Sequence, residues 1–133
     1  MKMNNQKILI VDDDDTIRNT LFEFLMKMGF EVAVAENGAM GLSVFNDAKN
    51  CDMVLADFRM PHMNGLIMAK EMKKKQPHII VIMMSGDLSN YRKSKNVANY
   101  FIEKPFKFED IYNLINDAFG LRDRERLPVP SDF

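Results

Sequence analysis

The sequence predicts an α/β protein whose core is a doubly wound, five-stranded parallel sheet with helices on both faces. Two observations support this fold class. Five short apolar runs are spread along the 133 residues, and they alternate with segments in which apolar residues recur at helical spacing. Strands that alternate with helices form right-handed crossovers, which place the strands parallel and the helices over both faces of the sheet.

The first half of the chain supplies three strands and two helices. The run "KILIV" (7–11) is nearly all apolar and favours a buried strand, and apolar residues at helical spacing follow over 17–28. "EVAVA" (31–35) predicts the second strand, and a helical pattern follows over 39–48. "DMVLA" (52–56) predicts the third strand, and the turn "DFRMPHMNG" comes after it.

The second half repeats the alternation twice. A helix is expected through "LIMAKEMKKK" (66–75), and "HIIVIMM" (78–84) is the most uniformly apolar run, which indicates a central strand. "SGDLSNYRKSKN" (85–96) predicts a loop with a poor helix. "YFIE" (100–103) predicts the fifth strand, and a last helix is expected over 108–119. Five such units fit the flavodoxin-like strand order 2-1-3-4-5.

The composition of the chain changes after Gly120, which ends the last predicted helix. The segment "LRDRERLPVPSDF" (121–133) is charged and then contains prolines. We therefore expect one folded domain over 1–120 and, over 121–133, a charged tail that is frayed or begins a linker.

The overall composition excludes several classes of protein. Hydrophobic residues make up 47% and charged residues 28%, and the net charge of -1 gives no general attraction to nucleic acid or to an anionic membrane. No apolar run is long enough for a signal peptide or a membrane span. The single Cys51 cannot form an internal disulfide, which suits a reducing compartment. We therefore expect a cytoplasmic protein that binds neither nucleic acid nor membrane.

Polar residues stand where the predicted strands end. Asp12 and Asp13 follow the first strand, Asp57 the third, Ser85 the fourth and Lys104 the fifth. In open α/β sheets, ligands bind outside the carboxyl ends of the strands, at the point where the chain order reverses. With the order 2-1-3-4-5, this point lies between strands one and three, so these five side chains should meet at one edge.

The spacing of the strands indicates what these residues could bind. Neighbouring strands are about 4.8 Å apart, so one Mg²⁺ could bridge oxygens of Asp13 and Asp57. Ser85 is one strand from Asp57, which a short hydroxyl can span. Lys104 is two strands away, roughly 10 Å by the same spacing, and its long side chain could reach back. The next two acids, Asp14 and Asp15, are expected to cap the following helix.

Four motifs occur in this order at the strand ends: "ILIVDDDDTIR", "VLADFRMPHMNG", "IMMSGD" and "FIEKPF". Together, and in these strand–turn contexts, they resemble the receiver domain of two-component response regulators. The resemblance extends over nearly the whole chain, to about Gly120.

This resemblance implies a phosphoacceptor and a metal site. Asp57 would take a phosphoryl group from a sensor histidine kinase or a histidine phosphotransfer protein. Asp12, Asp13, Asp57 and the backbone carbonyl of Arg59 would hold Mg²⁺. Such a protein is not an enzyme in the usual sense, because it assists only its own phosphorylation and dephosphorylation.

The resemblance also implies a switch. Ser85 would hydrogen-bond the phosphoryl group, Lys104 would pair with it, and Phe101 would be the aromatic residue that turns inward. The Lys104–Pro105 peptide bond would be cis. The downstream effector is unknown, and whether the protein forms a dimer on phosphorylation is an open question.

Two alternative interpretations remain open at this point. "DDDDT" (12–16) also fits the D-x-D-x-T pattern of haloacid-dehalogenase-like phosphatases, with Asp12 as the nucleophile. That family needs a late acidic pair, and Glu109–Asp110 opens a helix instead of ending a strand. A receiver-like interaction module that takes no phosphate is the other alternative. Its support is the segment between Ser85 and Lys104, which is short for the family and has few apolar residues, so its helix should be short or irregular.

Two opposite charges flank the predicted site. Arg59 follows Asp57 by two residues, and Asp87 follows Ser85 by two residues. We expect both at the rim, where a bridge between them could cover the phosphoryl group and slow its hydrolysis.

Overall fold

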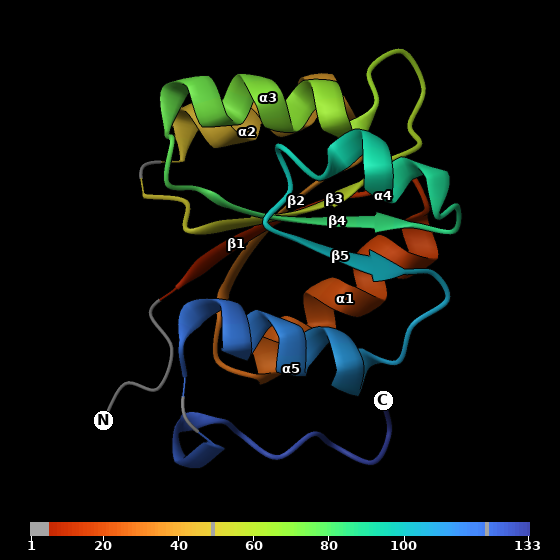
Figure 1. Ribbon diagram of the computed structural model, residues 1–133. Helices are drawn as coiled ribbons and strands as arrows, with labels where there is room; N and C mark the ends of the chain where they lie inside the picture. Colours follow the sequence, from red (N-terminus) through yellow and green to blue (C-terminus); the bar gives the residue numbers. More distant parts are fainter. Residues whose placement is uncertain (1–5, 49, 122) are drawn as a thin grey trace.

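The computed structural model confirms the predicted architecture, with five helices around one parallel sheet (Figure 1). It describes residues 6–48, 50–121 and 123–133. The strands of the sheet are β1 (Lys7–Val11), β2 (Glu31–Ala35), β3 (Met53–Asp57), β4 (Ile80–Ser85) and β5 (Tyr100–Glu103). The helices are α1 (Asp15–Lys27), α2 (Gly38–Asp47), α3 (Gly65–Lys75), α4 (Ser89–Ser94) and α5 (Phe108–Phe119).

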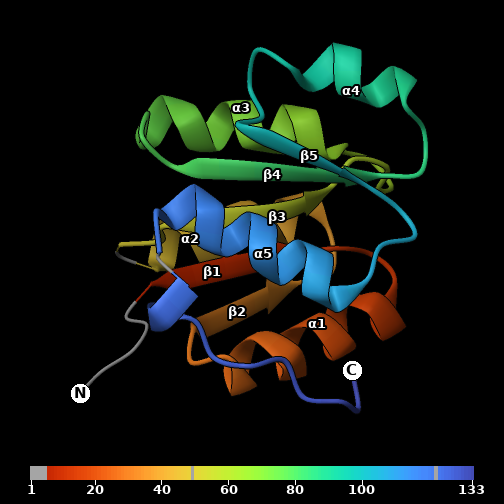
Figure 2. The same cartoon turned by 60° about the horizontal axis from the view of Figure 1, so that its bottom comes forward.

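The order of the strands is β2-β1-β3-β4-β5, as predicted, and every pairing is parallel. Helices α1 and α5 cover one face of the sheet, and α2, α3 and α4 lie over the other (Figures 1 and 2). The three middle strands β1, β3 and β4 are almost entirely buried, because apolar layers pack on both of their faces.

The register of the strands aligns their carboxyl ends. Asp57 pairs with Met84 across β3 and β4, and Ser85 pairs with Glu103 across β4 and β5. β3 ends one residue later than predicted, so Asp57 is its last residue and not the first residue of the loop. The side chains that follow β1, β3, β4 and β5 therefore share one edge of the sheet.

Helix α4 has only six residues, which confirms the prediction of a short helix. Its buried residues, Asn90 and Ser94, are both polar, whereas Leu88 just before it and Tyr91 within it are exposed. Burial of apolar surface supplies most of the stability of surface helices. A segment without an apolar buried face cannot extend into a long helix.

The described residues of the tail pack on the domain, along α1 and α5 (Figure 2). The ring of Phe133 lies 5.1 Å from Phe24 of α1 and 6.0 Å from Phe108 of α5, measured between centroids. The Leu127 backbone N–H donates to the Tyr112 hydroxyl at 2.7 Å. Apolar burial against α1 and α5 orders a segment whose local composition is typical of linkers. The boundary near residue 120 stays a prediction.

No described helix combines the length and the apolar content that crossing a membrane requires; this holds for residues 6–48, 50–121 and 123–133.

Candidate functional site

The polar residues predicted at the strand ends lie together at the carboxyl edge of the sheet. Asp57 ends β3 and Ser85 ends β4, while Asp12 directly follows β1 and Lys104 directly follows β5. With Asp13, they line one open hollow. The sheet order brings these residues together although they are far apart in the sequence.

The acidic part of the site consists of Asp12, Asp13 and Asp57. One carboxylate oxygen from each lies within 4.8 Å of the others. Asp12 is fully buried and Asp57 nearly so, whereas Asp13 is exposed. Like charges this close repel one another, and a divalent cation would relieve the repulsion. Carboxylate oxygens are the ligands that Mg²⁺ prefers, so the residues present fit that ion.

Lys104 provides positive charge beside two of these acids. Its Nζ donates to Asp12 Oδ2 at 2.7 Å and lies 3.3 Å from Asp57 Oδ1. The bond to Asp12 was not foreseen from the sequence. The peptide bond to Pro105 is cis, which confirms that part of the prediction.

The pKa values of Asp57 and Lys104 are shifted by their surroundings. Burial, and after it the Asp12 carboxylate, raise the pKa of Asp57 from 3.8 to about 7, although Lys104 acts in the opposite direction. Burial lowers the pKa of Lys104, but the hydrogen bond to Asp12 and the attraction of Asp57 outweigh it, so that the pKa is raised. Lys104 therefore stays charged, and without a cation Asp57 changes protonation near neutral pH.

The loop after β3 approaches the backbone of Asp57 closely. Gly65 N–H donates to the Phe58 carbonyl at 2.8 Å, and a Cβ added to Gly65 would lie 2.3 Å from the Asp57 carbonyl oxygen. Only glycine fits this contact without a shift of the backbone. The next helix begins here, capped by Asn64, whose side chain accepts from Ile67 N–H at 2.9 Å. The loop thus fixes where β3 ends and where Asp57 stands.

The other two aspartates of the acidic run belong to α1. Asp14 is its N-cap and accepts from Ile17 N–H at 3.1 Å, as predicted. Asp15 is the first helical residue and forms an ion pair with Arg18 instead of capping. Arg18 also donates to the backbone carbonyl of Asp12 at 2.9 Å. These contacts fasten α1 to the site.

The Ser85 hydroxyl is held by residues of the β4–α4 segment. It accepts hydrogen bonds from Asn90 Nδ2 at 2.9 Å and from the Asp87 backbone N–H at 3.1 Å. Asn90 is only 2% exposed. Sequence reasoning missed Asn90; its only signal was a polar amide five residues after Ser85, in a helix with few apolar residues.

The remaining predicted residues lie at the margins of the site. Arg59 lines the hollow. Phe101 is half-buried in β5, and the Tyr91 ring packs edge-on against it with centroids 5.3 Å apart. The predicted bridge between Arg59 and Asp87 is absent from the ion pairs of the described residues. Asp87 instead accepts from the Ser89 backbone N–H at 2.9 Å, and this bond is the main reason that the pKa of Asp87 is lowered.

With this geometry established, comparison with known proteins decides the family. The family model described as "Response regulator receiver domain" matches residues 8–116. The chain belongs to the response regulator receiver domain family.

Two relatives differ in how much of their length the match covers. It is 35% identical over 123 residues to sporulation initiation phosphotransferase F of Bacillus subtilis (strain 168), a match that covers 90% of this chain and 98% of that protein. It is 31% identical over 123 residues to regulatory protein AtoC of Escherichia coli (strain K12), a match that covers 90% of this chain but 26% of that protein. The chain spans nearly all of the first relative and about a quarter of the second.

A solved receiver structure is also similar. Response regulator protein TrrA of Thermotoga maritima, solved in complex with Mg(2+)-BeF, has a TM-score of 0.76 and 34% sequence identity to this receiver domain. The match covers 84% of this chain and 97% of that chain.

Membership of the family decides between the predicted classes of function. The chain is a phosphoacceptor receiver domain of two-component signalling, and its Asp12, Asp13 and Asp57 form the acidic pocket typical of the Mg²⁺ site in receivers. The haloacid-dehalogenase-like alternative is not supported. Its proposed nucleophile, Asp12, is fully buried and bonded to Lys104.

Proposed function

We propose that Asp57 is the residue that accepts the phosphoryl group, and that the donor is a phosphohistidine of a sensor histidine kinase or a histidine phosphotransfer protein. The observation that carries this assignment is the placement of Asp57. It ends β3, between β1 with its acids and β4 with Ser85, and its carboxylate lies 3.3 Å from the Lys104 ammonium. Both carboxylate oxygens of Asp12, in contrast, already accept hydrogen bonds, from the Asp14 N–H at 2.9 Å and from Lys104 at 2.7 Å.

The proposed step is an in-line transfer. One Asp57 carboxylate oxygen attacks phosphorus, the bond from phosphorus to the donor imidazole nitrogen breaks, and that nitrogen keeps the electron pair and takes up a proton. Lys104 stands where it can pair with an oxygen of the arriving group. Little covalent chemistry is left for the protein, so positioning and charge supply the catalysis.

Asp12, Asp13, Asp57 and the Arg59 backbone carbonyl are the proposed ligands of Mg²⁺. When bound, the ion supplies positive charge that offsets the acids and the phosphoryl oxygens. The Thermotoga maritima relative, solved with Mg(2+)-BeF, supports the choice of ion. In this chain, the raised pKa of Asp57 means that a cation should also help to keep the attacking carboxylate ionised.

The output of the domain is proposed to depend on Ser85 and Phe101. The Ser85 hydroxyl lines the same hollow as Asp57 and could donate to a phosphoryl oxygen. Phe101 lies in the strand next to β4, so movement of Ser85 could change the space available to its ring. The effector that reads this change is unknown, and a phosphorylation-dependent dimer is one form that it could take.

The relatives support a position within a phosphorelay. The relative that this domain matches over nearly its full length is named a phosphotransferase. In the regulatory protein AtoC, the match covers only part of a longer chain. We place this receiver in the cytoplasm, without direct binding to nucleic acid or membrane, because its charge is nearly balanced and its single thiol is buried.

A labelling experiment tests the assignment. The protein is incubated with acetyl phosphate and Mg²⁺, and the mass of the intact protein reports the phosphoryl group. We expect labelling of the wild type and of Asp14→Asn, because asparagine also caps helices well. Asp57→Asn should not be labelled. Undiminished labelling of Asp57→Asn would contradict the assignment, and an unlabelled wild type would favour the phosphate-independent interaction module.

A further inference from the structure

The Ser85 hydroxyl has a hydrogen-bonding arrangement that leaves its proton available. A hydroxyl can donate one hydrogen bond and accept two. Both acceptor positions of Ser85 are filled, by Asn90 Nδ2 at 2.9 Å and by the Asp87 N–H at 3.1 Å. Among the described residues, the sole acceptor for its own proton is the Asp87 carbonyl, at 3.4 Å, which is near the limit of a hydrogen bond.

We propose that Asn90 is a positioning residue, which aims the Ser85 proton at the phosphoryl group on Asp57 and passes the resulting movement of Ser85 to helix α4. This inference rests on the role proposed above for Ser85. Asn90 was not among the residues that the resemblance to receivers implied, and it acts only through Ser85.

The first part of the proposal follows from the bonds. When an oxygen acceptor arrives on Asp57, Ser85 can turn its proton away from the weak contact with Asp87 and still accept both N–H donors. Two accepted hydrogen bonds also polarise the O–H group, which strengthens its donation. Without the amide of Asn90, one acceptor position is empty and the hydroxyl is free to point elsewhere.

The second part follows from how α4 is held. Asn90 and Ser94 form the buried face of this six-residue helix, and the Ser94 hydroxyl has no hydrogen-bond partner among the described residues. The Asn90 amide is therefore the side-chain hydrogen bond that joins the buried face of α4 to the end of β4. Because no apolar side chain of α4 is buried, this bond is a large part of the attachment.

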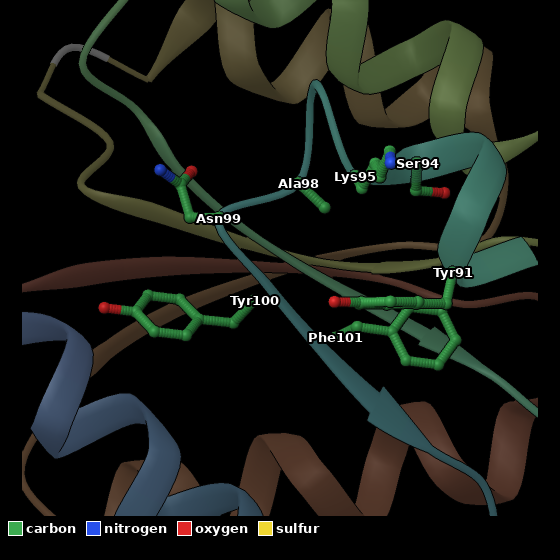
Figure 3. Close-up of a pocket in the computed structure, with 7 residues that line it drawn as sticks. All are labelled: Tyr91, Ser94, Lys95, Ala98, Asn99, Tyr100 and Phe101. Carbon is green, nitrogen blue, oxygen red and sulfur yellow. The ribbon is translucent and has the colours of Figure 1, made fainter. Parts of the chain in front are cut away.

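The neighbouring residue contacts the other switch position. Tyr91 follows Asn90 on the same helix, and its ring packs edge-on against Phe101 of β5 (Figure 3). A cavity of about 110 Å³ lies between α4 and β5, lined by both rings and by Ser94. The helix thus touches Ser85 through one residue and Phe101 through the next, and the cavity gives it room to shift. A movement of Ser85 toward Asp57 would draw Asn90 with it and change the contact between Tyr91 and Phe101.

The test uses the full chain with Mg²⁺ and beryllofluoride as the probe, because beryllofluoride on a carboxylate imitates an acyl phosphate. Two quantities are measured, the affinity for beryllofluoride and the change that it causes in hydrogen exchange of the α4 amides. Asn90→Leu keeps a similar volume but removes the N–H donor, and Asn90→Ala is the second variant if the leucine protein folds poorly. Ser94→Ala is the matched control, because it changes the other buried residue of the same helix.

We expect Asn90→Leu to weaken the affinity for beryllofluoride about three- to tenfold, the usual range for one lost hydrogen bond. It should also abolish most of the exchange change in α4, whereas Ser94→Ala should keep both near wild type. In a Ser85→Ala background, Asn90→Leu should have no further effect, because the residue acts through that hydroxyl.

Equal losses with Asn90→Leu in the wild-type and Ser85→Ala backgrounds would overturn this inference alone, since Asn90 would then only stabilise the helix. Losses of affinity and of the exchange change that are as large with Ser94→Ala as with Asn90→Leu would overturn it as well. A wild type that fails to bind beryllofluoride would instead contradict the proposed function, and this inference with it.

Discussion

The raised pKa of Asp57 makes a prediction about stability. Asp57→Asn replaces a buried acid by a neutral side chain of the same shape. An acid with a higher pKa in the folded than in the unfolded chain binds more protons when folded, so its ionisation destabilises the fold as pH rises. The pKa of Asp57 is about 7 in the folded protein and 3.8 ordinarily, so the free energy of unfolding falls between these two pH values and changes no further above them. The substitution removes that loss.

The size of the effect follows from the same two values. Their difference corresponds to about 4 kcal/mol, and the slope within the window is about 1.4 kcal/mol per pH unit. Without Mg²⁺, the stability advantage of Asp57→Asn over wild type should therefore grow by about 4 kcal/mol between pH 4 and pH 8. Saturating Mg²⁺ should shrink this advantage, because the cation stabilises the ionised carboxylate.

Urea unfolding in a chelator, followed by circular dichroism at a series of pH values, measures this difference. Asp14→Asn removes a negative charge from the same acidic run and keeps the helix cap, so it controls for a general loss of charge. An advantage of Asp57→Asn that does not change from pH 4 to pH 8 would refute the reasoning, since the carboxyl would then have similar pKa values in both states.

Three further predictions concern packing. Gly65→Ala should destabilise the protein by about 1–3 kcal/mol in urea unfolding, because its Cβ would collide with the Asp57 carbonyl oxygen. Gly86→Ala, whose Cβ has its nearest neighbour 3.8 Å away, is the control, and an equal loss there would contradict the argument. Phe133→Ala should cost about 1–3 kcal/mol and lower the Tm, since this ring packs on α1 and α5; an unchanged Tm would show that the packed tail adds no stability. Cys51 is 1% exposed and burial raises its pKa to about 11, so iodoacetamide at pH 8 should modify it only in urea, and rapid modification of the folded protein would argue against this environment.

The strand order and the location of the site were predictable because they depend on local patterns. Each apolar run is long enough for a strand and is bounded by polar or turn residues, and parallel strands carry their functional residues at the same end. The end of β3 was misplaced by one residue, since pairing with Met84 of β4 decides whether Asp57 belongs to the strand. The short α4 was also predictable, because its segment has too few apolar residues to pack.

What the sequence did not reveal depends on contacts between distant residues. Nothing near Phe133 in the sequence indicates the aromatic rings of α1 and α5 against which it packs. The bond from Lys104 to Asp12 joins the ends of two strands that are far apart in the sequence. The bond from Asn90 to Ser85 is local in sequence, but it depends on how the turn between β4 and α4 folds. The predicted bridge between Arg59 and Asp87 is not formed among the described residues, where Asp87 Oδ1 accepts from the Ser89 backbone N–H instead.

The contact between Asp12 and Lys104 joins positions 92 residues apart, and it has a consequence for a chain that is still being synthesised. On the ribosome, β1 and β3 emerge well before β5, so the acids exist for some time without the ammonium group between two of them. Synthesis proceeds at about 5–20 residues per second, which makes this interval a matter of seconds. A nascent chain that ends before residue 104 carries Asp57 but lacks the Lys104 ammonium group, so under the proposed function it is not yet a full acceptor. Competence to receive a signal therefore arrives with the last strand, after the rest of the sheet has been made.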